Sequence, residues 1–421
     1  MASIVVNGDT SGAVTLSAPA TAGTVTVTLP SANGTMLTTA SSTGISGSAI
    51  SSGTVAEAYG GTGTSTGYYG FKNRIINGAM VIDQRNAGAS VTLNGSESFI
   101  TDRFSCGDVT DGSFTAQQVS DAPAGFINSL KCTITSADTS LTTTQTAYCF
   151  QTVEGLNIAD LAWGTANAAT ITISFWVKSS LTGTFGGALR NSAANRAYPF
   201  TYAISAANTW EYETITIAGD TSGTWLTTNG VGINLQFSLG AGPDRLGTAG
   251  AWNANNNVGA TGQVQIIGTN GATWQVTGVQ LEKGSTATSF DYRPIGTELA
   301  LCQRYCYMFQ NPTGASGDGS LIGSGYADTS SQGVYFITFP VSMRTTPSLT
   351  TVSTANGIEQ AYYNGTVTTH NPTSISLISN ITTPNGGLMT VGGASFSNGT
   401  GAFLRYATQS ITPCVFVSAE L

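Results

Sequence analysis

The chain has 421 residues, and only 9% of them are charged, against about 25% in an average soluble protein. Its 14 Lys and Arg are outnumbered by 22 Asp and Glu and never cluster, which argues against a nucleic-acid-binding face. The sequence has no run of 18 apolar residues, and its N-terminus lacks a charged segment followed by an apolar one. We therefore expect neither membrane insertion nor a signal peptide.

Residues 1–40 carry short alternating runs separated by turn signals, as in "GTVTVTLPSANGT", which predicts a small N-terminal β unit. The unit has few large apolar side chains, so we expect it to need copies of itself or a docking partner. Residues 41–67 are rich in Gly, Ser and Thr, which is typical of a flexible linker. Spaced apolar residues favour the alternative, a segment intertwined with partner chains: Ile45, Ile50, Val55 and Tyr59.

Residues 68–293 predict one all-β domain, a sandwich or jelly roll. Turn-like segments separate its best strand candidates, which are "ITISFWVKSS", "WEYETITIAG", "VGINLQFSL", "GQVQIIG" and "WQVTGVQLEKG". The first candidate alternates strictly, so that one face is apolar and the other is polar. The apolar positions are Ile171, Ile173, Phe175 and Val177, and the others are Thr172, Ser174, Trp176 and Lys178.

The stretch "YRPIGTELALCQRYCYMF" departs from this β pattern, and we assign residues 294–310 to a short connecting helix. Apolar residues recur there at steps of four and three, as on one helix face: Ile295, Leu299, Cys302, Cys306 and Phe309. Such a seam suits three helices that pack around a trimer axis. The alternative is a helix that lies on the sandwich of its own chain, which uses the same stripe.

Residues 311–421 predict a C-terminal β-sandwich with strands in "GVYFITFPVSMRTTPSLTTV", "SISLISNITT" and "GAFLRYATQSITPCVFVSAEL". Several of its tyrosines are flanked by Gly, Asn and Ser, which predicts loops. An aromatic ring can stack on a sugar while neighbouring amides and carboxyls bind the sugar hydroxyls. The alternative for any one ring is that it covers a strand or a subunit contact. We name as candidate glycan-binding residues Tyr326, Asp328, Tyr362, Tyr363 and Asn364.

The six cysteines form no CxxC pair, so we expect free buried thiols, no disulfide, no metal and no cofactor. Asp108 and Asp111 are a weak candidate for a structural calcium site, with an acidic turn as the alternative. We expect no catalytic residues. The single histidine, His370, follows no GxSxG motif, and the acids Glu211 and Glu213 lie on an alternating strand where solvated charges are the simpler interpretation.

Several segments, in order along the chain, resemble bacteriophage tail fibres. The segments "SGAVTLSAPATAGTVTVTLPSANGTMLTTASS" and "AYGGTGTSTG" are similar to the N-terminal unit of such fibres and the junction after it. The segments "NRIINGAMVIDQRNAG" and "VTGVQLEKGSTATSFDYRPIGTELALCQRY" resemble the opening and exit of their carbohydrate-binding-module-like jelly roll, and "FPVSMRTTPSLT" and "VSAEL" resemble a distal tip domain. The resemblance implies an elongated homotrimer of the virion tail, made in the host cytoplasm. Its N-terminus would dock on a tail or baseplate protein, and its C-terminus would face the host.

We therefore expect a structural virion protein, a tail fibre that attaches to host surface polysaccharide, in the form of lipopolysaccharide, without cleaving it. The alternatives are a tailspike-type depolymerase and a purely structural fibre segment. We place the glycan contact in residues 311–421, because the last domain of a fibre anchored by its N-terminus meets the cell first. The jelly roll is the competing location, with a stacking surface from Trp163, Trp210, Trp225, Trp252 and Trp274.

Overall fold

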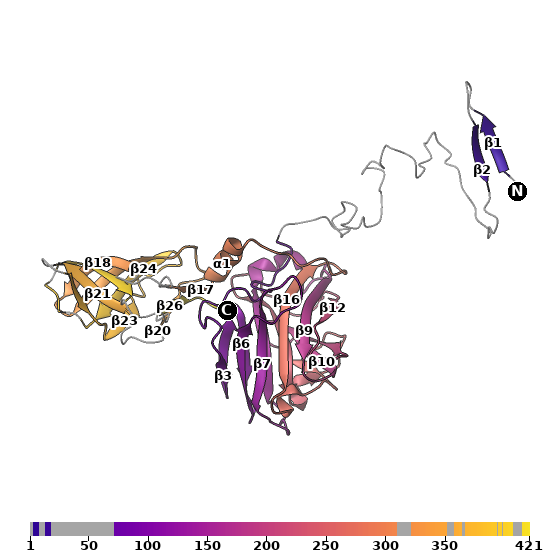
Figure 1. Cartoon of the computed structure of the whole chain (residues 1–421), viewed down its shortest axis with the longest axis horizontal. Coiled ribbons are helices and arrows are strands. Elements are labelled where there is room, and N and C mark those ends of the chain that lie inside the picture. The colour runs from indigo at the N-terminus through magenta and orange to yellow at the C-terminus, as the bar shows by residue number, and fades with distance from the viewer. Residues whose placement is uncertain are drawn as a thin grey trace. The chain divides into compact units, whose positions relative to one another are not determined.

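A computed structural model of the chain describes residues 3–7, 13–17, 71–309, 321–351, 358–363, 367–393, 395–397, 399–406 and 415–421. This described part is all-β with a single α-helix, which confirms the predicted fold class (Figure 1). Its first element is an antiparallel hairpin of β1 (Ser3–Asn7) and β2 (Ala13–Ser17). The further strands predicted before residue 40, and residues 41–67, lie outside the described residues.

Two six-stranded antiparallel sheets form a β-sandwich within residues 71–309 (Figure 1). The first sheet has the order β11 (Ala197–Ile204), β10 (Gly183–Arg190), β13 (Val231–Ala241), β8 (Thr146–Glu154), β5 (Phe104–Asp108) and β4 (Glu97–Thr101). The second has the order β12 (Glu211–Ile217), β9 (Ile171–Ser179), β16 (Thr273–Lys283), β7 (Ser129–Ser136), β6 (Ser113–Val119) and β3 (Val91–Leu93). Two-residue strands β14 (Leu246–Gly247) and β15 (Gly259–Ala260) pair in parallel beside them.

The inner faces of both sheets meet in one apolar core. On β9 the predicted apolar face is fully buried, whereas Trp176 and Lys178 on the alternate positions reach the surface. Aromatic rings pack edge to face at the centre, with the Phe175 ring centroid 5.0 Å from that of Phe237. Burial of this kind stabilises by about 1.5–3 kcal/mol for each large apolar side chain, so the alternation on each strand holds the two sheets together.

One predicted strand is wrong. The segment "GQVQIIG" forms no strand and ends in the 3₁₀ turn η6 (Ile266–Gly268). A strand would point the neighbouring residues Ile266 and Ile267 to opposite faces, whereas the turn buries both in the core. The other 3₁₀ turns lie in connections between strands: η3 (Gly155–Asn157), η4 (Ala159–Leu161) and η5 (Pro243–Arg245).

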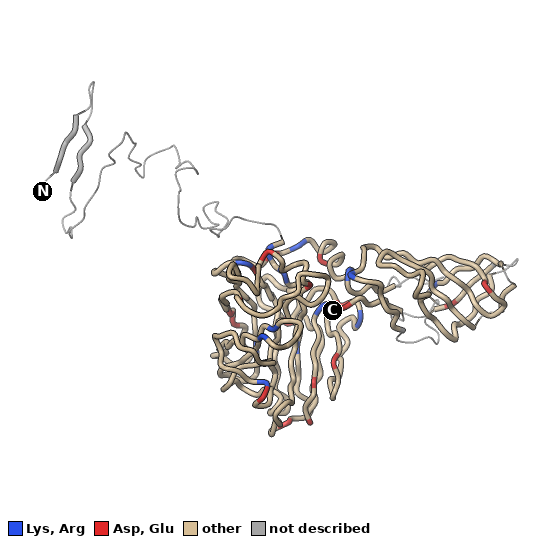
Figure 2. The backbone as a smooth tube through the Cα atoms, turned by 180° about the vertical axis from the view of Figure 1, so that it is seen from behind, with Lys and Arg blue, Asp and Glu red and all other residues tan. Residues whose placement is uncertain are grey.

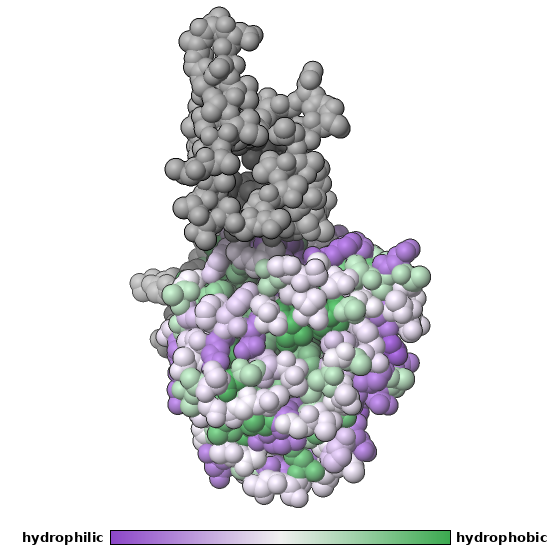
Figure 3. Space-filling model, turned by 90° about the vertical axis from the view of Figure 1, so that its right-hand side faces the viewer, coloured by the Kyte–Doolittle hydropathy of each residue, from purple (hydrophilic) through white to green (hydrophobic). Residues whose placement is uncertain are grey.

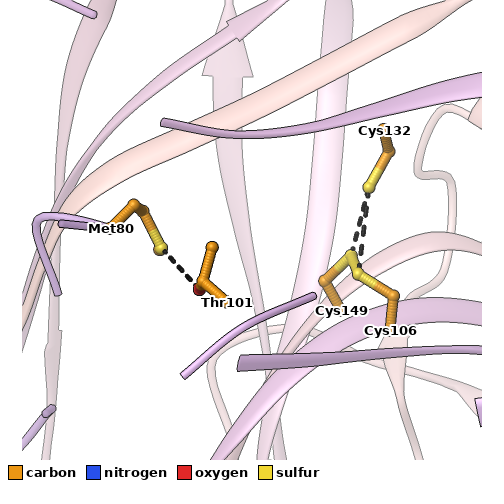
Figure 4. Close-up of a disulfide and its surroundings, with 5 residues drawn as sticks. All are labelled: Met80, Thr101, Cys106, Cys132 and Cys149. Atoms are coloured by element: carbon orange, nitrogen blue, oxygen red, sulfur yellow. Dashed lines mark hydrogen bonds between the residues drawn. A yellow bond between two sulfur atoms is a disulfide. The ribbon is translucent and has the colours of Figure 1, made fainter. Parts of the chain in front are cut away.

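The cysteine prediction is also wrong in one respect, because Cys106 on β5 and Cys149 on β8 form a disulfide. The two residues are direct cross-strand partners, and this neighbourhood arises from strand pairing over a sequence separation of 43. Cys132 reaches them from the opposite sheet, with its sulfur 3.3 Å from that of Cys149 (Figure 4). The remaining described cysteines, Cys132, Cys302 and Cys306, are free and buried, as expected.

The connecting helix is shorter than predicted. Helix α1 spans only Ile295–Gln303, and the chain then enters β17 (Cys306–Met308), which pairs with β26 (Val415–Ser418). The helical period fails there because a partner strand from the far C-terminus takes up the backbone hydrogen bonds, and local periodicity cannot reveal such a partner. The nine residues of α1 are too few to cross a membrane, and no other described helix is long enough to do so.

Most of the apolar stripe that was assigned to a trimer axis packs against residues of its own chain. Cys302 is fully buried against Ile76, Ile82 and Tyr305, and Leu299 packs on the same cluster. Cys306 is fully buried in β17, so neither cysteine is available to line an axis, which corrects that assignment. The stated alternative, a helix lying on its own chain, is the arrangement found. Ile295 differs, since 62% of its surface is exposed.

The C-terminal domain is a second sandwich with its own apolar core. Its larger sheet has the order β22 (Val367–His370), β21 (Ile358–Tyr363), β25 (Gly401–Tyr406), β18 (Leu321–Thr329), β19 (Gln332–Thr338), β24 (Gly386–Gly392) and β23 (Ser374–Leu377). Its smaller sheet has the order β17, β26 and β20 (Ser348–Thr351). Because β17 follows α1 directly, the final strand of the chain is paired with the segment that leaves the first sandwich.

Buried charges join the chain's last residues to the first sandwich. The Glu420 carboxylate accepts hydrogen bonds from Arg85, at 3.0 Å, and from the fully buried Arg103. The Arg103 guanidinium also lies 3.6 Å from the ring centre of Tyr305, whose hydroxyl donates to Glu154 at 2.6 Å. Figure 2 shows charged residues near the C-terminus of a chain that otherwise carries few. These ion pairs are shielded from water, so each charge relies on its partner to offset the free-energy cost of its burial.

We predict that replacing Cys106 and Cys149 together by alanine lowers the free energy of unfolding by about 2–4 kcal/mol, because the unfolded chain gains the entropy of an unclosed loop. Denaturant titration measures the loss. Dithiothreitol should lower the unfolding midpoint of the wild-type chain and leave that of the double variant unchanged. Peptide mapping that finds all cysteines reduced in the native protein would contradict the disulfide.

A second prediction concerns the junction. Glu420→Gln should destabilise the protein by about 3–5 kcal/mol, since it removes the carboxylate that two buried guanidinium groups, those of Arg85 and Arg103, share. Asp328→Asn is the matched control, because Asp328 is exposed and such surface changes usually alter stability by less than about 0.5 kcal/mol. Equal denaturation midpoints for the two variants would rule out a stabilising role for the Glu420 pairs.

Candidate functional site

Aromatic side chains gather on the outer face of the β12–β9–β16 sheet. Trp176 on β9 and Tyr212 on β12 are cross-strand partners, with ring centroids 5.3 Å apart and a tilt of 49°. Both occupy the outward positions of their strands, and 44% of the Tyr212 surface is exposed. Cross-strand aromatic pairs stabilise a sheet, but a pair that faces water also offers a flat apolar surface to a ligand.

A third ring, Trp210, extends this aromatic surface at the start of β12. The ammonium of Lys178 lies 5.0 Å from the Trp210 ring centre and is ion-paired with Asp121. The indole N–H of Trp210 points to the same Asp121 carboxylate at 3.4 Å. The hydrogen bond from Lys178 lowers the pKa of Asp121, so this carboxylate is charged and helps to orient the ring.

A glycine allows another ring to approach Trp176. Gly278 has a φ of +62° and lies within a β-bulge of β16, between Thr277 and Gln280. A Cβ atom at this position would lie 2.7 Å from the Phe126 ring and 3.1 Å from the Trp176 ring. Only a residue without a side chain therefore permits Phe126 to close this part of the surface.

Phe126 begins a cluster of three mutually contacting rings. Its centroid lies 5.1 Å from Phe290 and 5.5 Å from Tyr292, and these two rings are 4.8 Å apart. The Tyr292 hydroxyl donates to the carbonyl of Gly125 at 2.7 Å, which fixes the ring although 58% of the residue is exposed. Residues 125–126 and 290–292 are thereby held together on this face.

These rings line an open hollow of about 430 Å³, which we call the aromatic hollow: Phe126, Trp176, Tyr212, Phe290 and Tyr292, with Ser174, Thr288 and Ser289. Apolar rings and a few polar groups in a concave surface are the usual composition of a small-ligand site. Viewed from the side on which Figure 1 labels β12 and β10, hydrophobic residues appear as separate patches among hydrophilic ones (Figure 3). None of the described residues that line this hollow is an Asp or a Glu.

A smaller hollow of about 220 Å³ adjoins it and shares Phe126, Phe290 and Tyr292. Its charged residues are paired with one another, since the Arg293 guanidinium lies 3.2 Å from Glu298. Glu298 also accepts a hydrogen bond from the backbone N–H of Asn77. This network attaches helix α1 to the sandwich, so we assign these charges a structural role.

The predicted C-terminal glycan site is not assembled as expected. Tyr326 and Tyr362 lie in strands β18 and β21 rather than in loops. Tyr362 is only 9% exposed, packs against Phe396 and His370, and donates its hydroxyl to the Ser395 carbonyl. Tyr362 pairs with Ala402 of β25, which is also buried, and both side chains belong to the core of the C-terminal domain.

The remaining members of that predicted site do not join Tyr362. Tyr326 pairs with Gly401, one residue from the partner of Tyr362, so alternation places the two rings on opposite faces of the sheet. Tyr326 and Asp328 are both exposed. The side chain of Tyr363, and Asn364 as a whole, lie outside the described residues.

The Asp108 carboxylate is occupied by hydrogen bonds, whereas the hydrogen bond described for Asp111 is made by its backbone. Asp108 accepts from the backbone N–H and hydroxyl of Thr110, while the Asp111 N–H donates to Asp138. Within the described ranges, no third carboxylate is gathered with Asp108 and Asp111. The one group of three metal-type ligands there is Cys106, Cys132 and Cys149, and the disulfide removes two of its thiolates.

The tryptophans proposed as a stacking surface in the jelly roll divide into two groups. Trp163, Trp225 and Trp274 are buried, and the indole N–H groups of the first two donate to Ala169 and Asp220. Trp210 and Trp252 are partly exposed. Trp210 lies beside the aromatic hollow, whereas Trp252 packs on Trp163 and Trp225 and donates its indole N–H to the Ala218 carbonyl. The prediction missed Trp176 and Tyr212, although their position on the polar side of amphipathic strands was a signal in the sequence.

No protein-family model and no curated protein matches the chain. Among solved structures, it is similar to the enzymatically active domain of tailspike protein 4 of bacteriophage CBA120, with 14% identity, a TM-score of 0.28, and coverage of 51% of this chain and 22% of that one. The chain therefore spans about a fifth of that tailspike domain. It is also similar to a putative sugar-binding protein from Bacteroides thetaiotaomicron, with 11% identity, a TM-score of 0.28, and coverage of 50% and 100%.

A third similar structure is the family 11 carbohydrate-binding module from Clostridium thermocellum in complex with a mixed-linked tetrasaccharide, with 12% identity, a TM-score of 0.25, and coverage of 48% and 100%. The neighbours named here are thus a tailspike domain and sugar-binding modules. Because these TM-scores are below 0.5, the functional assignment rests on the geometry of the aromatic hollow.

Proposed function

We propose that the chain is a structural fibre protein of a phage tail that attaches to cell-surface glycan, and that the aromatic hollow is its glycan contact. The observation that supports this assignment is the set of five rings around a hollow that also presents hydroxyl groups. The C–H groups of a sugar stack on aromatic faces, while its hydroxyls exchange hydrogen bonds with polar groups at the rim. Thr288 and Ser289 line the hollow and their hydroxyl oxygens can accept such bonds, although the Thr288 hydroxyl itself donates to Glu282 and Ser174 is buried.

Binding without cleavage is part of the proposal. Glycoside hydrolysis needs two carboxyl groups about 5–9.5 Å apart on either side of the scissile bond. None is among the described residues that line the aromatic hollow, and the acids described around it are engaged: Asp121 by Lys178 and Trp210, Asp291 by the backbone N–H of Asn73, and Glu298 by Arg293. Incubation with a bound polysaccharide should therefore produce no new reducing ends.

The proposed location differs from the one that the sequence suggested, which was the C-terminal domain. Tyr326 and Phe336 are exposed there and make that domain the second candidate. Truncating the chain after Phe309 would not separate the two locations, because β26 pairs with β17 and Glu420 pairs with Arg103. Single substitutions on each surface are needed instead.

We predict that Trp176→Ala and Tyr212→Ala each weaken binding to a polysaccharide selected from a microarray of bacterial surface glycans by roughly tenfold or more, as expected for rings at the centre of a site. Tyr326→Ala is the matched control on the other domain and should leave affinity unchanged. Unfolding midpoints of the variants exclude misfolding. If only Tyr326→Ala weakens binding, the site belongs to the C-terminal domain.

We also propose a homotrimer in the virion, with its N-terminus toward a tail or baseplate protein. Two exposed isoleucines at the smaller hollow offer a surface for neighbouring copies: Ile127 and Ile295. Three copies would multiply weak sugar contacts through effective concentration, so that a site with only millimolar affinity would still hold a cell.

The trimer predicts a mass near three times the 43.0 kDa of one chain in multi-angle light scattering at micromolar concentration. Ile295→Asp should shift that mass toward one chain, because it places a charge in the proposed contact. Ile381→Asp changes an exposed isoleucine of the C-terminal domain and serves as the control. A monomer mass for the unaltered chain would refute the proposal.

A further inference from the structure

The aromatic surface continues beyond the aromatic hollow along strands β9 and β12. Tyr212 and Trp176 form one cross-strand row on the outer face. Trp210 lies two residues before Tyr212, so it forms the next row with Lys178 on the same face. Two residues of a strand span about 7 Å, so the two rows are immediate neighbours. A sugar chain that fills the aromatic hollow therefore reaches the second row with its next unit.

The second row carries a carboxylate beside its ring. Asp121 forms an ion pair with Lys178 and accepts a hydrogen bond from the Trp210 indole N–H at 3.4 Å. The Asp121 side chain is 50% exposed, and that of Lys178 is 13% exposed. The three side chains thus hold one another in place while the carboxylate stays accessible. We call them the polar end of the aromatic surface: Asp121, Lys178 and Trp210.

Asp121 is positioned by the same loop that closes the aromatic hollow. Residues 120–128 connect β6 to β7 and also supply Phe126 of the hollow. The Ser129 hydroxyl donates to the Asp121 carbonyl at 2.6 Å. The Thr277 hydroxyl on β16 donates to a carbonyl at the other end of the loop at 2.7 Å. The loop is held against the sheet at both ends, so the polar end and the hollow keep a fixed separation.

The polar end has hydrogen-bonding capacity left for a ligand. Hydrogen bonds from Lys178, Gln275 and Trp210 lower the pKa of Asp121, so its carboxylate is ionised at neutral pH. The oxygens of a carboxylate offer about four acceptor positions, and an ammonium has donors beyond the one that Lys178 gives to Asp121. An acceptor and a donor therefore lie side by side next to an aromatic ring.

We propose that the polar end recognises a sugar unit with two free neighbouring hydroxyl groups, and that Asp121 and Lys178 are the residues that select it. One hydroxyl donates to the Asp121 carboxylate and the other accepts from the Lys178 ammonium. The two side chains together have no net charge, so the unit they take is neutral, and its C–H face lies against the Trp210 ring. This inference rests on the proposed function, since it assigns the next sugar unit of the same glycan contact.

The exposure of Asp121 sets the size of the selection. A buried group that hydrogen-bonds a substrate hydroxyl rejects an analogue without that hydroxyl by about 10⁴-fold, because the group is left without a partner. Asp121 is half exposed, so water takes the place of a missing hydroxyl and the penalty is smaller. We expect a preference of about tenfold, as for the loss of one hydrogen bond to a charged group.

The test uses the full chain and simple probes, the methyl glycosides of glucose, galactose and mannose. Each pair of neighbouring hydroxyls in these sugars includes the one at C3, so the 3-deoxy analogue of each lacks every such pair. In saturation-transfer NMR titrations, at least one glycoside should bind, and its 3-deoxy analogue should bind about tenfold more weakly.

Two variants separate recognition of the hydroxyls from support of the ring. Asp121→Ala should weaken binding of the glycoside about tenfold and leave that of the 3-deoxy analogue unchanged, so that the preference disappears. Trp210→Ala should weaken binding of both probes by the same factor and keep the preference, because the ring contacts C–H groups. Asp244→Asn is the matched control, since Asp244 is an exposed acid that follows a strand of the other sheet, and it should change nothing.

The outcomes keep this inference apart from the proposed function. The inference fails if none of the three glycosides binds, or if Asp121→Ala retains the preference for the glycoside over its 3-deoxy analogue. Loss of polysaccharide binding in Trp176→Ala would then still support the aromatic hollow. If Trp176→Ala binds the polysaccharide normally while Asp121→Ala loses the preference, the polar end binds sugar and the assignment of the hollow is wrong.

Discussion

The alternation of side chains across two sheets is the constraint on which this structure depends. Every strand of the first sandwich sends one set of side chains into a shared apolar core, and that burial supplies the stabilisation. The side chains on the other face do not pack in this core, so they need not be apolar and can contact ligands instead. On β9, Phe175 and Val177 hold the sandwich together, while Trp176 and Lys178 on the same strand belong to the aromatic surface.

Both outer faces of the sandwich use this freedom, and in different ways. The β12–β9–β16 face presents rings in a hollow, and its shape depends on a bulge and on the absence of a side chain at Gly278. The alternate positions of the other sheet carry Arg190, Asn234 and Gln236, and there the Gln236 side chain is buried. Rings suit the apolar C–H surface of a sugar.

The C-terminal residues matter to the first sandwich as well as to their own domain. Strand β26 pairs with β17 immediately after α1, and Glu420 then places its carboxylate between Arg85 and Arg103. Arg344 of the C-terminal domain binds the carbonyls of Ala419 and Glu420 at 2.7 and 2.6 Å. The chain has few charged residues, and several of them form buried ion pairs at this junction. The stability of the junction therefore depends on a small number of side chains.

The sequence by itself determined the all-β class, the place of Trp176 on the face opposite the apolar residues of its strand, and the start of helix α1 to within one residue of Ile295. These follow from periods of two and 3.6 residues along a short stretch. Only the tertiary structure decided which distant residues meet. It joined Cys106 to Cys149, turned Cys306 from helix to strand by pairing it with Ser418, and buried Tyr362 in a core rather than a sugar site. The physical reason is that strand pairing and sheet packing are contacts between segments far apart in the chain, and local periodicity carries no information on which segments will pair.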